Sequence, residues 1–141
     1  MKGGFDRNKS LEELEKADWG EPTHNSYLVT TLHRLRRKPL RDFEIEDFRI
    51  MIGQGIGLPF LVPLALERLE EEPLSAGDFY RGDLLRAVLQ IHEEFWMNHP
   101  DSFEGVRNVV GRVKDLLPSL NEIDRMLVLE VLAAAPESLT A

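Results

Sequence analysis

The chain has 141 residues, 43% of them hydrophobic and 30% charged, with a formal net charge of −8 at pH 7. These proportions predict one soluble globular domain, because a chain of this length buries about two thirds of the surface that it exposes when unfolded. The absence of cysteine excludes disulfides and thiolate metal sites, and the negative charge argues against a general nucleic-acid binder, since Lys and Arg make most phosphate contacts. The first residues lack the apolar core of a signal peptide, and no apolar run is long enough for a membrane span, so we expect a cytoplasmic protein.

Two helices are predicted in the first 38 residues. Ser10 and Glu13 match a capping box, in which each side chain binds the free backbone N–H of the other residue. The first helix should end before the segment Trp19-Gly20-Glu21-Pro22. Trp19 is expected to anchor the N-terminal arm, which is the part of the chain that precedes the second helix. Ser26 is expected to cap a second helix that ends near residue 37, ahead of a proline.

Positive charge is concentrated between residues 33 and 41, at the end of the second helix. The helix dipole favours cations there, and the acids Glu44, Glu46 and Asp47 are close enough in sequence to pair with some of them. The alternative is a binding site for a small anion or nucleotide, formed by His33, Arg34, Arg36, Arg37 and Arg41.

Three closely spaced glycines, at positions 53, 55 and 57, lie between two predicted helices, residues 45–52 and 63–72. Glycines before a helix can form a phosphate loop, but such a loop needs a Lys followed by Ser or Thr, and a dinucleotide site needs a preceding strand. Neither is present. The segment is therefore predicted to be a corner between packed helices, with Pro63 at the first position of the second helix and that helix as the most enclosed one.

Three more helices are predicted after the corner. The first spans about 83–98, with His92 on its apolar face, and the second runs from about 102 to Pro118. The last begins at a capping box on Ser119 and turns these residues inward: Ile123, Met126, Leu127, Val131 and Ala134. No strand pattern occurs, so the sequence predicts a single all-α domain over residues 1–141, a bundle of six or seven helices, with residues 1–9 and 137–141 frayed.

The sequence contains no complete catalytic motif. The segment His92-Glu93-Glu94 begins like a zinc-protease helix, but Trp96 stands where the second histidine is required. No nucleophile, base and orienting group share a local signature. We therefore predict a protein that is not an enzyme and that has neither a metal site nor a cofactor.

Acidic residues gather at the end of the helix that follows the glycine corner. They are Glu67, Glu70, Glu71 and Glu72. Carboxylates at a helix C-terminus oppose the dipole, at a cost of a few tenths of a kcal/mol each. A local rule broken in this way is a hint of a binding face, because such costs are tolerated at functional sites.

Several segments between residues 9 and 96 are distinctive: KSLEELE, LHRLRRKPL, EDFR, IGQ, LVPLAL and GDFY. Together they resemble a family of immunity proteins from bacterial contact-dependent growth inhibition (CDI) systems. The resemblance implies a cytoplasmic protein that binds and neutralises the C-terminal toxin domain of a cognate surface-delivered effector. Many such toxins are nucleases, and an acidic body suits a basic partner of that kind. The family has no catalytic residues to carry over.

The resemblance makes a toxin domain the expected partner, with neither nucleic acid nor membrane as a second one. We predict that an acidic face docks on the toxin and blocks its substrate channel, with Phe79 beside Tyr80 as an aromatic anchor. The predicted toxin-binding residues are Glu67, Glu70, Glu71, Glu72, Asp78 and Tyr80.

Overall fold

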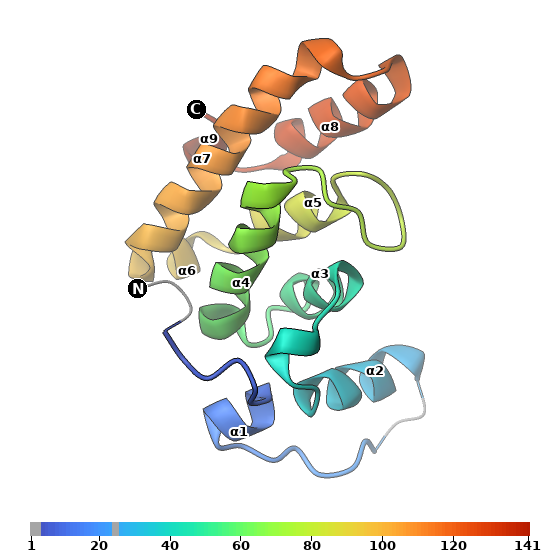
Figure 1. Cartoon of the computed structure of the whole chain (residues 1–141), viewed down its shortest axis with the longest axis vertical. Helices are drawn as coiled ribbons and strands as arrows, with labels where there is room; N and C mark the ends of the chain where they lie inside the picture. The colour runs from blue at the N-terminus through green and yellow to red at the C-terminus, as the bar shows by residue number, and fades with distance from the viewer. Residues whose placement is uncertain (1–3, 24–25) are drawn as a thin grey trace.

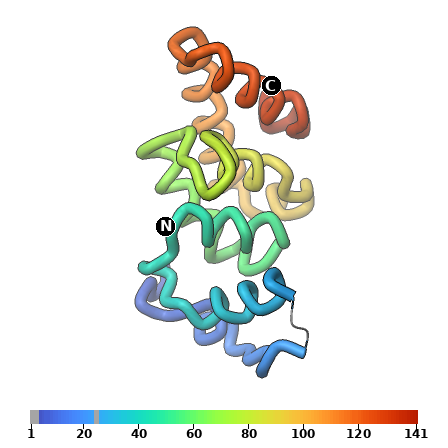
Figure 2. Tube along the Cα trace, turned by 90° about the vertical axis from the view of Figure 1, so that its right-hand side faces the viewer, coloured from blue at the N-terminus to red at the C-terminus, as the bar shows by residue number. Residues whose placement is uncertain are grey.

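The computed structural model describes residues 4–23 and 26–141, and in them the chain is helical without a β-strand. The predicted all-α class and single domain are confirmed. Figures 1 and 2 show an elongated molecule in which the chain passes from the N-terminal helices at one end to the C-terminal helices at the other. The elements are α1 (Leu11–Glu15), α2 (Tyr27–Arg36), η1 (Leu40–Asp42), α3 (Ile45–Gly53), α4 (Leu58–Glu71), α5 (Asp83–Leu89), α6 (Glu93–Asn98), α7 (Pro100–Leu116), η2 (Leu117–Ser119), α8 (Glu122–Ala134) and α9 (Glu137–Thr140).

Side-chain caps start several of the helices, among them α1, α2 and α8. The capping box at Ser10 and the cap at Ser26 are both present, as predicted. The start of α8 differs, because Asn121 rather than Ser119 accepts the backbone N–H of Asp124, at 2.8 Å. The hydroxyl of Ser119 instead donates to the carbonyl of Leu116 and closes η2. The predicted second capping box is therefore wrong by two residues.

The glycine corner between α3 and α4 is confirmed. Gly55 and Gly57 have φ angles of +70° and +66°, a conformation that glycine adopts without strain. Gly57 also lies against Leu11, since a Cβ atom at this glycine would come within 2.6 Å of the leucine side chain. Helix α4 begins at Leu58, directly after the corner, so the predicted start at Pro63 is wrong and this proline lies inside the helix.

Helix α4 supplies seven buried residues, more than any other helix, and packs between α3 and α7. This agrees with its prediction as the most enclosed helix. The predicted helix 83–98 is instead two helices, α5 and α6, separated at residues 90–92. Ile91 turns into the core at the break, while His92 is exposed and precedes α6. The prediction of a partly buried His92 is wrong. Ile91 is buried at the break instead, and its side chain has no polar group that would need a hydrogen-bond partner in the core.

The predicted inner face of α8 is right only in part, because Val131 is buried and Leu127 partly buried while the other three predicted residues are exposed. The buried residues of the helix are Val128 and Val131, whereas Ile123 and Met126 are 73% and 58% exposed. Ala134 is exposed too. The reason is that α8 carries apolar residues on several sides, and only the side toward α5 and η2 finds a partner at this end of the molecule. The spacing of apolar residues along a helix does not by itself show which side of the helix is buried.

The described parts of both ends that were expected to fray make contacts. The ring of Phe5 packs edge-on against Phe60, with centroids 5.2 Å apart, and the backbone N–H of Arg41 donates to the carbonyl of Arg7 at 2.8 Å. At the other end, Leu139 of α9 is buried. Residues 1–3 lie outside the described residues.

Candidate partner-binding surface

Three of the predicted acids form one exposed group at the C-terminal end of α4. Glu70, Glu71 and Glu72 are all exposed. The conflict with the helix dipole is reduced from outside the helix, because the guanidinium of Arg112 on α7 donates to the carbonyl of Glu70. The negative charges are therefore retained at the surface at little cost to the fold.

Glu67 lies one turn earlier and is engaged within the molecule. Both of its carboxylate oxygens accept hydrogen bonds from Arg7 of the N-terminal arm, at 2.9 and 2.5 Å. This pairing raises the pKa of Arg7, with the side-chain hydrogen bond as the largest cause. The negative charge of Glu67 is therefore partly offset by Arg7 within the molecule.

The loop 73–82, which connects α4 to α5, is held by a buried carboxylate. Asp83 is 3% exposed, and its oxygens accept the backbone N–H groups of Gly77 at 2.7 Å and Phe79 at 3.1 Å. Gly77 has no room for a side chain, because a Cβ atom there would come within 2.4 Å of Glu46. The loop is thus fixed in one conformation although it lies at the surface.

A second carboxylate, from α3, holds the same loop. Glu46 accepts the backbone N–H of Asp78 at 3.0 Å and the Nε–H of Arg49 at 2.6 Å. The hydrogen bond from Arg49 is the largest cause that lowers the pKa of Glu46, and burial opposes it. Asp78 itself is exposed, so its carboxylate is presented to solvent from a restrained backbone.

Phe79 is the more available of the two candidate aromatic anchors. It is 70% exposed, and the guanidinium of Arg49 lies 4.3 Å from the centre of its ring. A cation over an aromatic face restrains the ring at low entropic cost. Tyr80 is half-buried, and its hydroxyl accepts a hydrogen bond from Arg86 at 3.2 Å. The structure thus presents Phe79 on a rigid loop, next to Asp78.

The carboxyl of Glu46 makes the stability of this loop depend on pH. Its pKa is lower in the folded protein than the ordinary 4.5, so its contribution is fully present above that value and is lost as the pH falls through the folded pKa. We expect Glu46→Gln to lower the free energy of unfolding at pH 7 and to differ progressively less from wild type toward about pH 3. Denaturant unfolding at a series of pH values measures this, and a pH-independent difference would contradict it.

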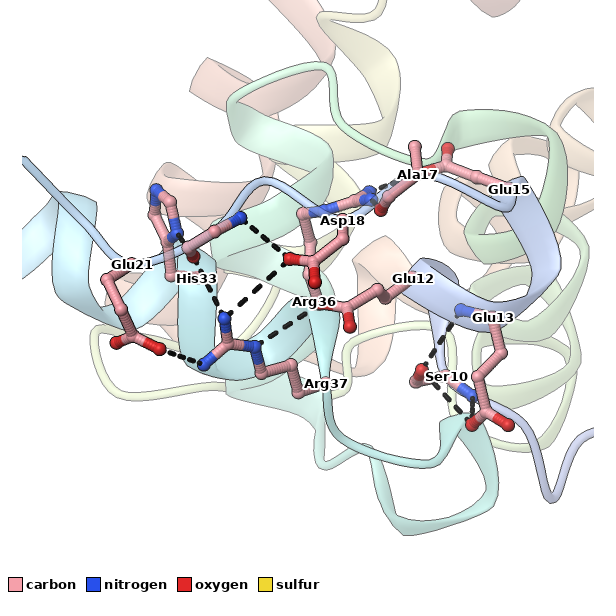
Figure 3. A network of polar contacts seen from close by, with 11 residues as sticks. Ser10, Glu12, Glu13, Glu15, Ala17, Asp18, Glu21, His33, Arg36 and Arg37 are labelled. Atoms are coloured by element: carbon pink, nitrogen blue, oxygen red, sulfur yellow. Dashed lines mark hydrogen bonds and ion pairs between the residues drawn. The ribbon is translucent and has the colours of Figure 1, made fainter.

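The basic segment 33–41 is engaged largely by the N-terminal arm (Figure 3). Arg36 is 1% exposed, and its guanidinium donates to the carboxylate of Glu15 and to the carbonyl of Ala17. The ring of Trp19 covers it, 4.2 Å from the guanidinium carbon. Trp19 therefore anchors the arm as predicted, and Arg36 is a structural residue of the interior.

Arg37 is surrounded by three carboxylates of the same arm, from Glu12, Asp18 and Glu21, at 3.3 to 3.9 Å (Figure 3). These contacts raise the pKa of Arg37, and the hydrogen bond that Arg37 donates to Glu12 is the largest cause. The other basic residues, apart from Arg34, have contacts of their own: the Nδ1 atom of His33 lies 3.2 Å from the Gly20 carbonyl, Lys38 binds Asp47, and Arg41 contacts Asn8 and Asp42.

The side chain of Arg34 is exposed, and it forms no hydrogen bond or ion pair within residues 4–23 and 26–141. Of the residues proposed for the alternative anion site, it is therefore the one that the fold leaves available. Ion pairs with the arm account for the density of positive charge, and the structure gathers no open basic cradle from the described residues.

The described residues contain neither a candidate membrane span nor a candidate metal cluster. No helix there is long and apolar enough to cross a membrane. No cluster of three or more His, Asp or Glu side chains in that part of the chain is arranged to hold a metal ion.

Comparison with known proteins gives one match. The sequence model of the family described as CDI immunity proteins matches residues 13–106, two thirds of the chain, from α1 into the first half of α7. No curated protein and no solved structure was found to match. The matched region contains the contacts of Arg36 with Glu15 and Ala17, the glycine corner, α4 and the loop 73–82, and the chain belongs to the CDI immunity proteins.

Proposed function

We propose that this protein binds the C-terminal toxin domain of its cognate CDI effector, in the cytoplasm, and blocks the access of substrate to a nuclease active site. The family match over residues 13–106 is the observation that carries this proposal. Neutralisation then takes place by binding alone, and the protein is not an enzyme.

The surface chemistry supports a basic toxin. A nuclease binds its substrate through Lys and Arg side chains that contact phosphates, so an inhibitor with exposed carboxylates is complementary to that channel. Glu70, Glu71 and Glu72 supply such carboxylates at the end of α4, and Asp78 supplies another from the loop 73–82.

The loop 73–82 supplies an aromatic anchor, which exposed charges alone do not provide. Exposed charge pairs mainly increase the association rate, whereas tight binding needs a buried anchor. Phe79 fits that role, because Arg49 and the two carboxylates that bind the loop backbone hold it in place before binding. The proposed mechanism is therefore fast, charge-driven encounter followed by insertion of Phe79.

We expect the Glu70→Lys/Glu71→Lys variant to associate with the toxin domain about tenfold more slowly at low salt, because two charge reversals weaken the attraction that speeds encounter. The toxin domain encoded by the neighbouring gene is the partner to use, and stopped-flow or surface-based kinetics at several salt concentrations are the measurement. The difference from wild type should shrink as the Debye length falls from about 10 Å at 0.1 M to about 3 Å at 1 M.

The matched control is Glu94→Lys/Glu104→Lys, which changes the net charge equally on α6 and α7 with two exposed acids. It should leave the association rate near that of wild type. If both variants slow association equally, net charge alone is responsible and the face at the end of α4 is not the docking surface. No binding and no inhibition of the toxin by the wild-type protein at micromolar concentration would refute the proposed function.

A further inference from the structure

Helix α8 carries an apolar face that no part of the described chain covers. Ile123 is 73% exposed, Met126 58% and Leu129 47%, and Ala133 beside them is exposed as well. These residues recur every three to four positions, so they lie on one side of the helix. The opposite side, with Val128 and Val131, packs against the body of the protein.

Two carboxylates border this face. Glu122 and Glu130 are exposed, and no ion pair or hydrogen bond engages their side chains within residues 4–23 and 26–141. The nearby cations have contacts of their own, and one of them, Arg86, donates to the hydroxyl of Tyr80 in a pocket that Glu130 also lines. Arg81 pairs with Asp124 at 2.9 Å, and Arg125 donates to the carbonyls of Leu117, Pro118 and Leu120. The face is therefore apolar at its centre and uncompensated negative at its border.

The face adjoins the loop 73–82. The ion pair between Arg81 of the loop and Asp124 of α8 joins the two segments. A pocket beside it is lined by residues of the loop, α5 and α8, among them Tyr80, Arg86, Leu127 and Glu130. Figure 1 shows the loop and α8 on the same half of the molecule, with α5 beside them. A partner seated on Phe79 can therefore reach α8 without a change of fold.

We propose that the outer face of α8, centred on Ile123 and Met126, is a second docking element for the toxin domain. It would receive an apolar side chain of that domain surrounded by Lys or Arg. This inference rests on the proposed function and extends its interface. The charge pattern points to a basic occupant, because neither Glu122 nor Glu130 forms an ion pair with another described residue.

A second copy of this chain does not fit the same surface. Two acidic borders would face each other in a symmetric contact, and like charges brought together are unfavourable. Helix α8 also lies outside the residues that the family model matches. It therefore belongs to the part of the chain that the shared pattern does not prescribe, which suits a contact that discriminates one toxin from another.

The first test is the Ile123→Ser/Met126→Ser variant. We expect its dissociation constant for the toxin domain to rise about 100-fold or more, since buried apolar anchors carry most of the energy of an interface. The matched control is Tyr27→Ser/Met97→Ser, which removes two large side chains that are at least as exposed, from other helices, and should bind like wild type. Equal unfolding midpoints for all three proteins would establish that the loss is local.

Hydrogen exchange of the wild-type protein, with and without the toxin domain, gives a second measurement that needs no variant. We expect slower exchange of the backbone amides of α8 in the complex. Wild-type affinity of the α8 variant, or unchanged exchange on α8 while the toxin is bound, would overturn this inference and leave the proposed function intact. Failure of the wild-type protein to bind the toxin would overturn both.

Discussion

Replacing Arg36 by Ala is expected to lower the free energy of unfolding by about 3 kcal/mol. Removal of one partner from a buried ion pair costs about 3–5 kcal/mol, and the lower value applies because Glu15 retains 29% exposure of its side chain. The substitution also takes the cation from beneath Trp19 and the donor from the carbonyl of Ala17. Urea unfolding followed by tryptophan fluorescence measures the effect, because Trp19 reports on the arm directly.

Arg34→Ala is the matched control for that substitution. Arg34 is on the same helix, two residues earlier, but its side chain is exposed and makes no polar contact with the described residues. Its removal should change the free energy of unfolding by less than about 0.5 kcal/mol. Equal effects of the two substitutions would mean that Arg36 is not buried against the arm.

Replacing Asp83 by Asn is expected to lower the free energy of unfolding by about 2 kcal/mol, because a hydrogen bond to a charged acceptor contributes about 1.5–3 kcal/mol. The carboxylate accepts backbone N–H groups from Gly77 and Phe79, whereas the amide of Asn has one acceptor oxygen and directs N–H groups at the other position. The loop 73–82 should lose its fixed conformation. Faster exchange of the amide hydrogens of Gly77 and Phe79 would report this directly.

The same substitution should weaken toxin binding, although Asp83 is buried and cannot touch a partner. A mobile Phe79 must be ordered during binding, and that ordering lowers the affinity. Asp78→Asn, in the same loop but exposed, is the control for stability and should change the free energy of unfolding by less than about 0.5 kcal/mol. If Asp83→Asn leaves both the exchange rates and the unfolding free energy unchanged, the proposed rigidity of the loop is wrong.

The role of Arg36 shows why the basic segment was open to two interpretations from sequence. In the chain it is one of several cations after a helix, and its neighbours in sequence do not distinguish it from Arg34. Its partners, Glu15 and Ala17, are 21 and 19 residues away. Burial and pairing over such a separation are decided when α1 and the arm pack on α2. Most of the basic residues between positions 33 and 41, which suggested an anion site, instead bind the N-terminal arm to the rest of the protein.

The candidate interface also contains parts that the sequence identified and parts that only the structure revealed. The acids at the end of α4 were identified from sequence, because their conflict with the helix dipole is a local property. The availability of Phe79 was not, since it depends on Arg49 from another helix. The outer face of α8 was predicted as an inner face. A helix with apolar residues on several sides gives no periodic signal that distinguishes the buried side from the exposed one.

The sequence by itself determined the helical class, the caps at Ser10 and Ser26 and the corner at Gly55 and Gly57, because each of these depends on residues within a few positions of one another. It also determined the family, because the family pattern is a property of the sequence and needs no tertiary contact. Only the tertiary structure decided the burial of Arg36, the break between α5 and α6, the hydrogen bonds from the loop 73–82 to Asp83, and the exposed face of α8. These features depend on which helices meet, and helix packing is set by the balance of burial over the whole core rather than by any local pattern.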